Sequence, residues 1–329
     1  MDPAPGPGSD MGTHAEPRRA PAGEIAAAGY ANPLAVMAFD HRSTFARLLR
    51  ATWPLSSAGR ETARRLKGVI LDGLIGAVQA EPAMEGAAAL IDEELAGELA
   101  DDVRRRNLLL VMPVEATGTD VLDFAYGDAF AEHIERFRPD LVKVLLRRNP
   151  RAPSPAQAIE DERLTRLTGW AGSHAYPVLL ELVVPPEPSD VQEPGSRERF
   201  DRDVRPGLMA EVMTRLQDRG VEPDVWKLEG LDRTADCEAV AKIAQRDGRA
   251  HVRCVVLGRA AEIPQMLQWL RAARAVEAYS GFAIGRSLWW NPLRSLLDGQ
   301  IGAERAADLI SDNYLSAYRT FFEGRPGRA

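Results

Sequence analysis

The sequence has very few cysteines and no long hydrophobic run. Only two cysteines occur in 329 residues, Cys237 and Cys254, and their contexts fit neither a disulfide framework nor a metal-binding motif. No apolar stretch approaches the roughly 20 residues that a helix needs to cross a bilayer. The N-terminus also lacks the apolar core of a signal peptide. We therefore expect a cytoplasmic protein with no membrane partner.

Three further absences narrow the classes of function. The five histidines are scattered and no pair has metal-ligand spacing, so we expect no metal ion. No G-x-G-x-x-G motif follows an apolar run, which argues against a dinucleotide, and we expect no cofactor. The formal net charge is −7, whereas nucleic-acid-binding surfaces are basic, so we expect no nucleic-acid partner.

The first 30 residues differ in composition from the rest of the chain. They are rich in Pro, Gly and Ala and have almost no large apolar side chains. Such a segment cannot bury enough surface to offset the entropy lost on ordering. We expect residues 1–30 to form a disordered tail and residues 31–329 to form a single catalytic domain.

From residue 34 onward, apolar runs alternate with stretches of helical character. The eight runs that predict strands are Leu34–Phe39, Ala88–Ile91, Leu108–Val114, Leu141–Leu146, Pro177–Val184, Val225–Leu228, Val252–Leu257 and Gly281–Ile284. Strands that are apolar on both faces and alternate with helices are typical of a parallel sheet covered by helices. Eight such units favour an α/β fold closed as a (β/α)8 TIM barrel over an open sheet. The first connection is long enough for an extra short helix at Ser43–Ala51.

Three of these runs carry an ionisable residue in their interior, namely Lys143, Glu181 and Lys227. A charged group is seldom buried without a partner or a function. Each residue taken alone is also compatible with a strand end that reaches solvent. Together they favour a functional site, because inward-facing side chains of neighbouring strands meet inside a barrel, near the carboxyl ends where barrel enzymes carry their chemistry.

Two neighbouring lysines can provide a nucleophilic amine. Close ammonium groups disfavour each other's charged form, and burial adds to this effect. One of Lys143 and Lys227 can then be a neutral amine near pH 7, the form that attacks a carbonyl to make a Schiff base. Glu181 is placed to transfer protons in such a reaction. Asp40, which follows the first strand, can hydrogen-bond a substrate hydroxyl or take its proton, and the sequence leaves both roles open.

The last two strands both end in a Gly-Arg pair. Glycine lets the backbone approach a ligand closely, and the arginine fork suits phosphate. Barrels commonly bind phosphate in the loops after strands seven and eight, although a surface arginine is the alternative for either pair alone. We expect substrate or phosphate binding by residues at these and neighbouring strand ends: Arg42, Glu115, Gly258, Arg259, Gly285 and Arg286.

Six segments together resemble one family. They are Phe39-Asp40-His41-Arg42, Val142–Leu145, Leu180–Pro186, Pro223–Gly230, Cys254–Arg259 and Gly281–Arg286. They look like the aldolase-like domain that is often fused to 5-dehydro-2-deoxygluconokinase in inositol breakdown. The resemblance extends more distantly to class I tagatose-bisphosphate and sulfofructose-phosphate aldolases, and it covers the chain from about Leu34 to Phe322.

The resemblance implies a TIM barrel in which Lys227 forms the Schiff base. Lys143 and Glu181 match the assisting pair, Asp40 matches the aspartate of the first strand, and Gly285-Arg286 matches the phosphate-binding end. The sequence departs from the family in two ways. We expect no kinase domain before the barrel, and Arg147-Arg148-Asn149-Pro150 replaces an aromatic-containing run after the fourth strand.

The implied activity is that of a class I aldolase acting on a ketose phosphate. The implied substrate is 5-dehydro-2-deoxygluconate 6-phosphate, which is split into glycerone phosphate and malonate semialdehyde. The alternatives are a class I aldolase for tagatose bisphosphate or sulfofructose phosphate, and a barrel that binds sugar phosphates without catalysis. In each case the expected partner is a small-molecule sugar phosphate, and assembly into a homo-oligomer stays open.

Overall fold

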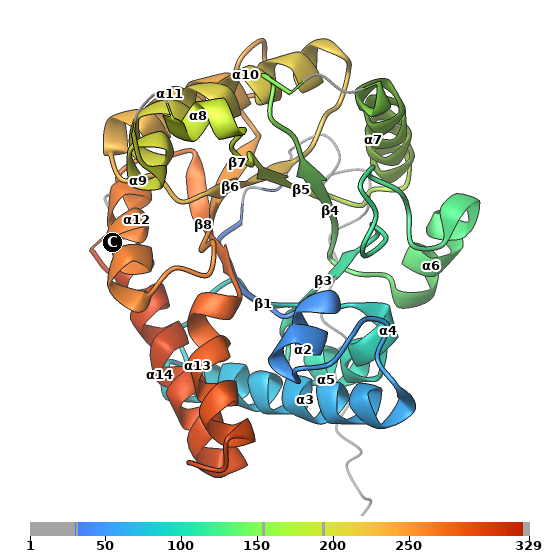
Figure 1. Ribbon diagram of the computed structural model, residues 1–329, viewed down its shortest axis with the longest axis vertical. Coiled ribbons are helices and arrows are strands. Elements are labelled where there is room, and N and C mark those ends of the chain that lie inside the picture. The colour runs from blue at the N-terminus through green and yellow to red at the C-terminus, as the bar shows by residue number, and fades with distance from the viewer. Residues whose placement is uncertain (1–29, 31, 153–154, 193–194, 325–329) are drawn as a thin grey trace, which may run out of the picture.

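Eight parallel strands close into a barrel in the order in which they occur along the chain (Figure 1). The computed structural model describes residue 30 and residues 32–152, 155–192 and 195–324. The strands are β1 (Leu34–Ala38), β2 (Ala87–Leu90), β3 (Leu109–Pro113), β4 (Leu141–Arg147), β5 (Val178–Val183), β6 (Val225–Glu229), β7 (Arg253–Leu257) and β8 (Tyr279–Ile284). The predicted (β/α)8 TIM barrel is confirmed.

Helices form the outer ring of the barrel (Figure 1). They are α2 (Ser43–Leu48), α3 (Ser57–Ala80), α4 (Glu93–Ala96), α5 (Ala100–Arg105), α6 (Phe130–Phe137), α7 (Ala156–Ser173), α8 (Pro188–Gln192), α9 (Arg197–Arg199), α10 (Arg205–Asp218), α11 (Thr234–Ala244), α12 (Ile263–Arg274), α13 (Arg286–Leu297) and α14 (Ala303–Phe322). Helix α2 is the extra helix predicted after the first strand. Within the described ranges, no helix is long and apolar enough to cross a membrane.

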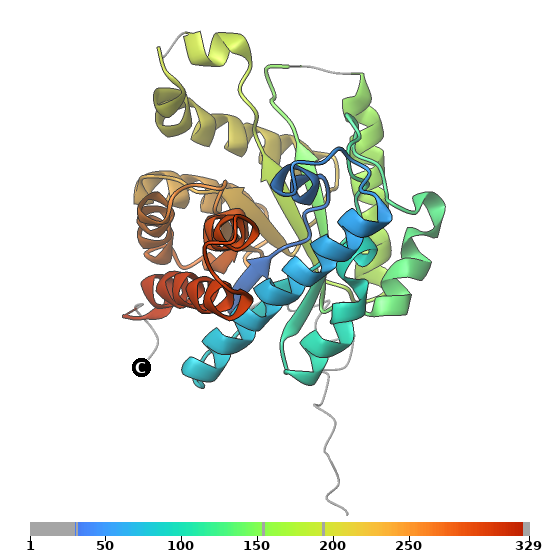
Figure 2. The same ribbon diagram turned by 60° about the horizontal axis from the view of Figure 1, so that its bottom comes forward.

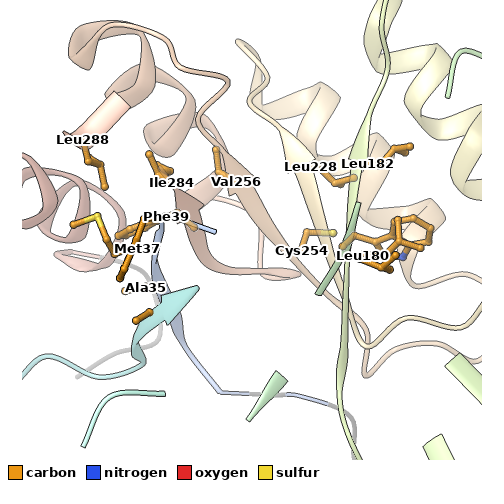
Figure 3. Close-up of a cluster of buried hydrophobic side chains, with 14 of the residues drawn as sticks. Ala35, Met37, Phe39, Leu180, Leu182, Leu228, Cys254, Val256, Ile284 and Leu288 are labelled. Atoms are coloured by element: carbon orange, nitrogen blue, oxygen red, sulfur yellow. The ribbon is translucent and has the colours of Figure 1, made fainter. Parts of the chain in front are cut away.

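The side chains of each strand alternate between the barrel interior and the surrounding helices. Leu34, Val36 and Ala38 of β1 belong to a small interior cluster, to which each of the other strands contributes at least one residue. Ala35 and Met37 of the same strand belong to the larger outer cluster between strands and helices (Figure 3). Both faces of each strand are therefore buried, which explains why the strands read as nearly continuous apolar runs.

The last helix closes the seam between β8 and β1. Helices α3 and α14 lie side by side on the outside of the barrel (Figure 2). Gly73 of α3 faces Ile310 of α14 so closely that a Cβ at Gly73 would lie 2.8 Å from Ile310 Cβ. The hydroxyl of Tyr314 donates a 2.6 Å hydrogen bond to the Ala35 carbonyl of β1. These contacts hold the first and last elements of the chain together.

The predicted tail, residues 1–30, lies outside the described residues except for Tyr30. Tyr30 is buried, with 7% of its surface exposed, and belongs to the interior cluster of the barrel with Leu34 and Val36. Burial raises the pKa of its hydroxyl above the usual range, and the Asp140 carboxylate adds to the effect. Tyr30 therefore packs with the barrel residues, and the division into a tail and a catalytic domain stays a prediction.

Candidate active site

A cavity of about 520 Å³ opens among the carboxyl ends of the strands. Its walls include all ten residues that the sequence pointed to: Asp40, Arg42, Glu115, Lys143, Glu181, Lys227, Gly258, Arg259, Gly285 and Arg286. The strand alternation explains this convergence. Lys143, Glu181 and Lys227 each lie two positions beyond an interior apolar residue, namely Leu141, Leu179 and Val225. Each charged side chain therefore points inward, one layer above the apolar floor.

Glu181 lies between the two lysines. Lys227 Nζ donates a hydrogen bond to Glu181 Oε2 at 2.9 Å, and Lys143 Nζ lies 3.2 Å from the same oxygen. Both lysines are 2% exposed. Glu181 and Lys227 are direct partners in the register of β5 and β6, so the strand pairing itself sets their contact.

Lys143 has three carboxylate partners. It donates to Asp40 Oδ2 at 2.9 Å and to Glu115 Oε1 at 2.6 Å, in addition to its contact with Glu181. Burial opposes the charged form, but the three carboxylates outweigh it and raise the pKa of Lys143 above its usual range. The expectation that the two lysines would lower each other's pKa is therefore wrong for Lys143, which stays an ammonium.

The pKa values of the three carboxyl groups around Lys143 shift in different directions. Burial alone would raise the pKa of Glu181, but Lys227 and Lys143 outweigh it and lower the value to about 2. Burial would also raise the pKa of Asp40, but the attraction of Lys143 and other nearby cations outweighs it and lowers the pKa. For Glu115, burial outweighs the attraction of Lys143 and raises the pKa. Asp40 and Glu181 are thus carboxylates at neutral pH, in the state that accepts a proton.

His41 also lines the cavity, although it was not among the residues predicted for the site. Its Nδ1 lies 3.7 Å from Asp40 Oδ1, and its ring packs edge-on against Trp289. Burial lowers the pKa of His41 to about 3, so the ring is neutral. Strand alternation would have turned His41 away from Asp40. The chain leaves β1 before this residue, and the loop geometry brings both side chains to the cavity.

Arg286 begins helix α13 at the rim of the cavity, directly after Gly285. Trp289 of the same helix donates a 3.0 Å hydrogen bond to the Ala38 carbonyl, which fixes the start of α13 against the end of β1. No hydrogen bond or ion pair of the Arg286 side chain occurs among the described residues. A helix N-terminus and a free guanidinium together form an arrangement suited to a phosphate.

The two glycines of the Gly-Arg pairs are required by packing. A Cβ at Gly285 would lie 2.4 Å from the Ala38 carbonyl oxygen, and one at Gly258 would lie 2.8 Å from Ile284 Cγ2. The sequence suggested that these glycines admit a ligand. The structure supplies a sufficient reason in packing, because Gly285 meets β1 and Gly258 meets β8.

Arg259 differs from Arg286 because its guanidinium is already paired. It contacts Asp201 Oδ2 at 2.7 Å and Glu229 Oε1 at 3.0 Å, and it lies over the ring of Trp269. Asp201 belongs to a π-helical turn, η3 (Phe200–Val204), which precedes α10. Arg259 therefore ties the segment after β5 to the ends of β6 and β7.

Side-chain hydrogen bonds hold the end of the first strand against its neighbours. Arg42 donates a 2.6 Å hydrogen bond to the Glu115 carbonyl. Lys67 of α3 is fully buried beneath the site and donates to the Phe39 carbonyl at 2.8 Å and to Asp92. These contacts fix the backbone on both sides of Asp40. The sequence could not reveal the role of Lys67, because it lies inside an ordinary amphipathic helix.

The cysteines take no part in the cavity. Cys237 and Cys254 are buried and unbridged. Burial raises the pKa of the Cys237 thiol to about 12 and also raises that of Cys254. In the part of the chain that the structure describes, no group of three or more His, Cys, Asp or Glu is arranged to hold a metal ion.

Comparison with solved structures finds the same fold in an aldolase. Fructose-bisphosphate aldolase from Plasmodium falciparum, in a ternary complex with TRAP and a small-molecule inhibitor, superposes with a TM-score of 0.58. The match covers 93% of this chain and 97% of the aldolase chain at 14% sequence identity, which shows the fold alone. No curated protein matches the sequence. A family model described as an uncharacterized protein conserved in bacteria matches residues 26–323. The chain therefore belongs to this family, DUF2090.

Proposed function

We propose that this protein is a class I aldolase in which Lys227 forms a Schiff base with a ketose phosphate. The observation that carries this proposal is the contact of one buried carboxylate, Glu181, with two buried lysines. Lys143 has three acidic partners, whereas Lys227 has one, and the three hold Lys143 as an ammonium. We therefore assign the role of the nucleophile, which requires an amine that has given up its proton, to Lys227.

Glu181 would receive that proton. Its Oε2 is 2.9 Å from Lys227 Nζ, within the range for direct proton transfer. The free amine attacks the ketone carbon to form a carbinolamine. Its hydroxyl group takes up a proton, the C–O bond breaks, and water leaves, giving a cationic iminium. Glu181 returns the proton in this step. Lys143, as a fixed cation, stabilises negative charge that develops on the carbinolamine oxygen.

Carbon–carbon cleavage then uses the iminium as the electron acceptor. A base removes the proton of the hydroxyl on the carbon β to the iminium, the aldehyde forms, and the bonding pair moves into an enamine. Asp40 is suited to this role because it is a carboxylate and shares Lys143 with Glu181. Protonation of the enamine carbon and hydrolysis of the iminium release the ketone product and return Lys227 to its amine.

The substrate that we propose is 5-dehydro-2-deoxygluconate 6-phosphate, with glycerone phosphate and malonate semialdehyde as products. Two arguments support it. Six segments of the chain resemble the aldolase-like domain for this substrate. Arg286 at the start of α13 also lies on the cavity wall without an acidic partner among the described residues, as a phosphate-binding arginine should.

A cleavage assay tests the proposal. The protein is incubated with 5-dehydro-2-deoxygluconate 6-phosphate, tagatose bisphosphate or sulfofructose phosphate, and glycerone phosphate or the corresponding ketone product is measured by enzymatic reduction. We expect cleavage of the first compound with the highest kcat/KM, and none by Lys227→Met. Faster cleavage of another compound would reassign the substrate. Cleavage of none would leave a barrel that binds sugar phosphates without catalysis.

A further inference from the structure

Six arginines line the cavity, and three of them are Arg47, Arg147 and Arg286. Arg47 lies on α2, Arg147 is the last residue of β4, and Arg286 begins α13 after β8. All three line the same cavity. Burial lowers the pKa of the Arg286 guanidinium, the positive charges of Arg47 and Arg147 add to the effect, and the Glu181 carboxylate opposes it, so both arginines lie near enough to act on Arg286.

These three arginines have no acidic partner among the described residues. Arg47 donates one hydrogen bond, to Thr44 Oγ1 at 3.2 Å, and neither Arg147 nor Arg286 makes a side-chain hydrogen bond or ion pair within those ranges. Arginines elsewhere at the cavity differ, since Arg259 pairs with Asp201 and Glu229. The neighbour of Arg147 in sequence, Arg148, pairs with Glu160 at 2.9 Å and with Asp161 at 2.5 Å. Clustered, unpaired guanidinium groups in a cavity favour the binding of anions.

Arg147 reaches this position through the alternation of β4. Lys143, Leu145 and Arg147 all face the cavity, whereas Arg148 turns outward to helix α7. Four residues of parallel strand span roughly 13 Å, so Arg147 stands at the rim above the catalytic layer. Its long side chain can reach back toward a ligand bound beside Lys143.

Arg147 and Arg286 start from opposite walls. In the closed barrel, β4 is four strands from β8 in either direction (Figure 1). Lys143 lies on β4 itself, and Glu181 and Lys227 lie on the next two strands toward β8, β5 and β6. A phosphate held at the start of α13 would engage Arg286. The charge of Arg147 would then remain available for a second anionic group on the same ligand.

We propose that Arg147 binds a second anionic group at the end of the substrate opposite the phosphate. The preferred ligands are thus acyclic sugar derivatives with an anion at each end, either a phosphate and a carboxylate or two phosphates. The orientation of the ligand rests on the proposed function. Arg147 is a specificity-determining residue, and a substrate that is uncharged at the end opposite the phosphate lacks the contact with Arg147.

Inert ligands test this inference apart from catalysis. Hexyl phosphate, 6-phosphonooxyhexanoate and hexane-1,6-diol bisphosphate carry no ketone, so their binding does not depend on Schiff-base formation. Calorimetry measures their Kd with wild type, Arg147→Ala, Arg147→Lys and a control, Arg305→Ala on the exposed side of α14. We expect wild type to bind the two doubly anionic ligands at least about 10-fold more tightly than hexyl phosphate, since charge-assisted contacts are strong.

Arg147→Ala should abolish this preference and leave the affinity for hexyl phosphate within about 2-fold of wild type, because it removes only the second contact. Arg147→Lys should restore part of the preference, and Arg305→Ala should match wild type. The stronger of the two doubly anionic ligands identifies the second group as a carboxylate or a phosphate. An equal loss of affinity of Arg147→Ala for singly and doubly anionic ligands would mean that all three arginines bind one phosphate. That result, or a wild type without any preference, overturns the inference.

Failure of the proposed function gives a different pattern. The preference for doubly anionic ligands would persist and would still depend on Arg147, while glycerone phosphate would form no covalent adduct with Lys227. Conversely, an adduct on Lys227 with no effect of Arg147→Ala on any ligand keeps the aldolase and removes the second anion site.

Discussion

One carboxylate oxygen, Glu181 Oε2, contacts the Nζ atoms of both Lys227 and Lys143, at 2.9 and 3.2 Å. The two lysines differ in what else surrounds them. Lys143 also contacts Asp40 and Glu115, and Lys227 has only this carboxylate among the described residues. The two lysines occupy similar positions in their strands, but they differ in the number of carboxylates that surround them. We propose on this basis that Lys143 is the fixed cation and Lys227 the nucleophile.

Replacing Glu181 should impair catalysis more than substrate binding. In Glu181→Gln the amide cannot accept the proton of Lys227, so we expect kcat to fall by about 10²–10⁴-fold, the usual contribution of a general acid or base. KM for the sugar phosphate should change little, because the phosphate contacts remain. Steady-state kinetics measure both, with the exposed Glu304→Gln in α14 as the control. Unchanged kcat in Glu181→Gln would exclude proton transfer through this residue.

Replacing Arg286 should weaken the binding of phosphorylated ligands but not that of their unphosphorylated analogues. A charge-assisted hydrogen bond is worth about 1.5–3 kcal/mol, so loss of two from Arg286→Ala should raise the Kd for glycerone phosphate roughly 10²-fold or more. The Kd for unphosphorylated dihydroxyacetone should stay constant. Arg286→Lys should recover only part of the affinity, because it keeps the charge but loses the two-pronged geometry.

Arg259→Ala is the matched comparison for Arg286→Ala. Its guanidinium is occupied by Asp201 and Glu229, so we expect a smaller effect on the affinity for glycerone phosphate and a larger loss of stability. If the two alanine variants lose phosphate affinity equally, or if Arg286→Ala weakens dihydroxyacetone as much as its phosphate, Arg286 is not the phosphate ligand.

Stability should depend on Glu181 and Asp40 in acid. Burial alone would raise the pKa of both carboxyls, but the neighbouring ammonium groups lower them, that of Glu181 to about 2. In the unfolded chain the same groups take up protons near about pH 4. The unfolded state thus binds more protons between about pH 4 and pH 2, and the free energy of unfolding falls as the pH decreases through this window.

Urea unfolding of Glu181→Gln over this window measures the contribution. The variant lacks the titrating group, so its free energy of unfolding should fall less steeply than that of wild type, by at most about 1.4 kcal/mol per pH unit. Glu304→Gln should follow the wild type. Parallel curves for Glu181→Gln and wild type would mean that the depressed pKa of Glu181 does not contribute to stability.

The start of the barrel should tolerate truncation up to Tyr30 but not its replacement. Residues 1–29 have almost no large apolar side chains, so their deletion should leave the melting temperature and the activity nearly unchanged. Tyr30→Ala should cost about 3 kcal/mol, because it removes a buried aromatic ring from the barrel interior. A large loss of stability on deletion, or none for Tyr30→Ala, would show that the boundary is misplaced.

The strands and the site residues were predictable because the signal is local. Each strand is a short apolar run. In three of them a charged residue lies two positions after an apolar residue of the barrel floor, as Lys227 does after Val225. The pairing of charges was not predictable. Asp201 reaches Arg259 from a π-helical turn, and three strand ends converge on Lys143. Such contacts depend on the barrel geometry, so neither the raised pKa of Lys143 nor the neutralisation of Arg259 can be read from the sequence.

Trapping of the covalent intermediate tests the central claim most directly. Borohydride added in the presence of glycerone phosphate reduces the iminium to a stable secondary amine, and peptide mass mapping locates it. The chain has only four lysines, Lys67, Lys143, Lys227 and Lys242, so each is resolved, and exposed Lys242 reports non-specific modification. We predict an adduct on Lys227 alone, absent from Lys227→Met. An adduct on Lys143 would exchange the two roles, and no adduct on either lysine would contradict the Schiff-base mechanism.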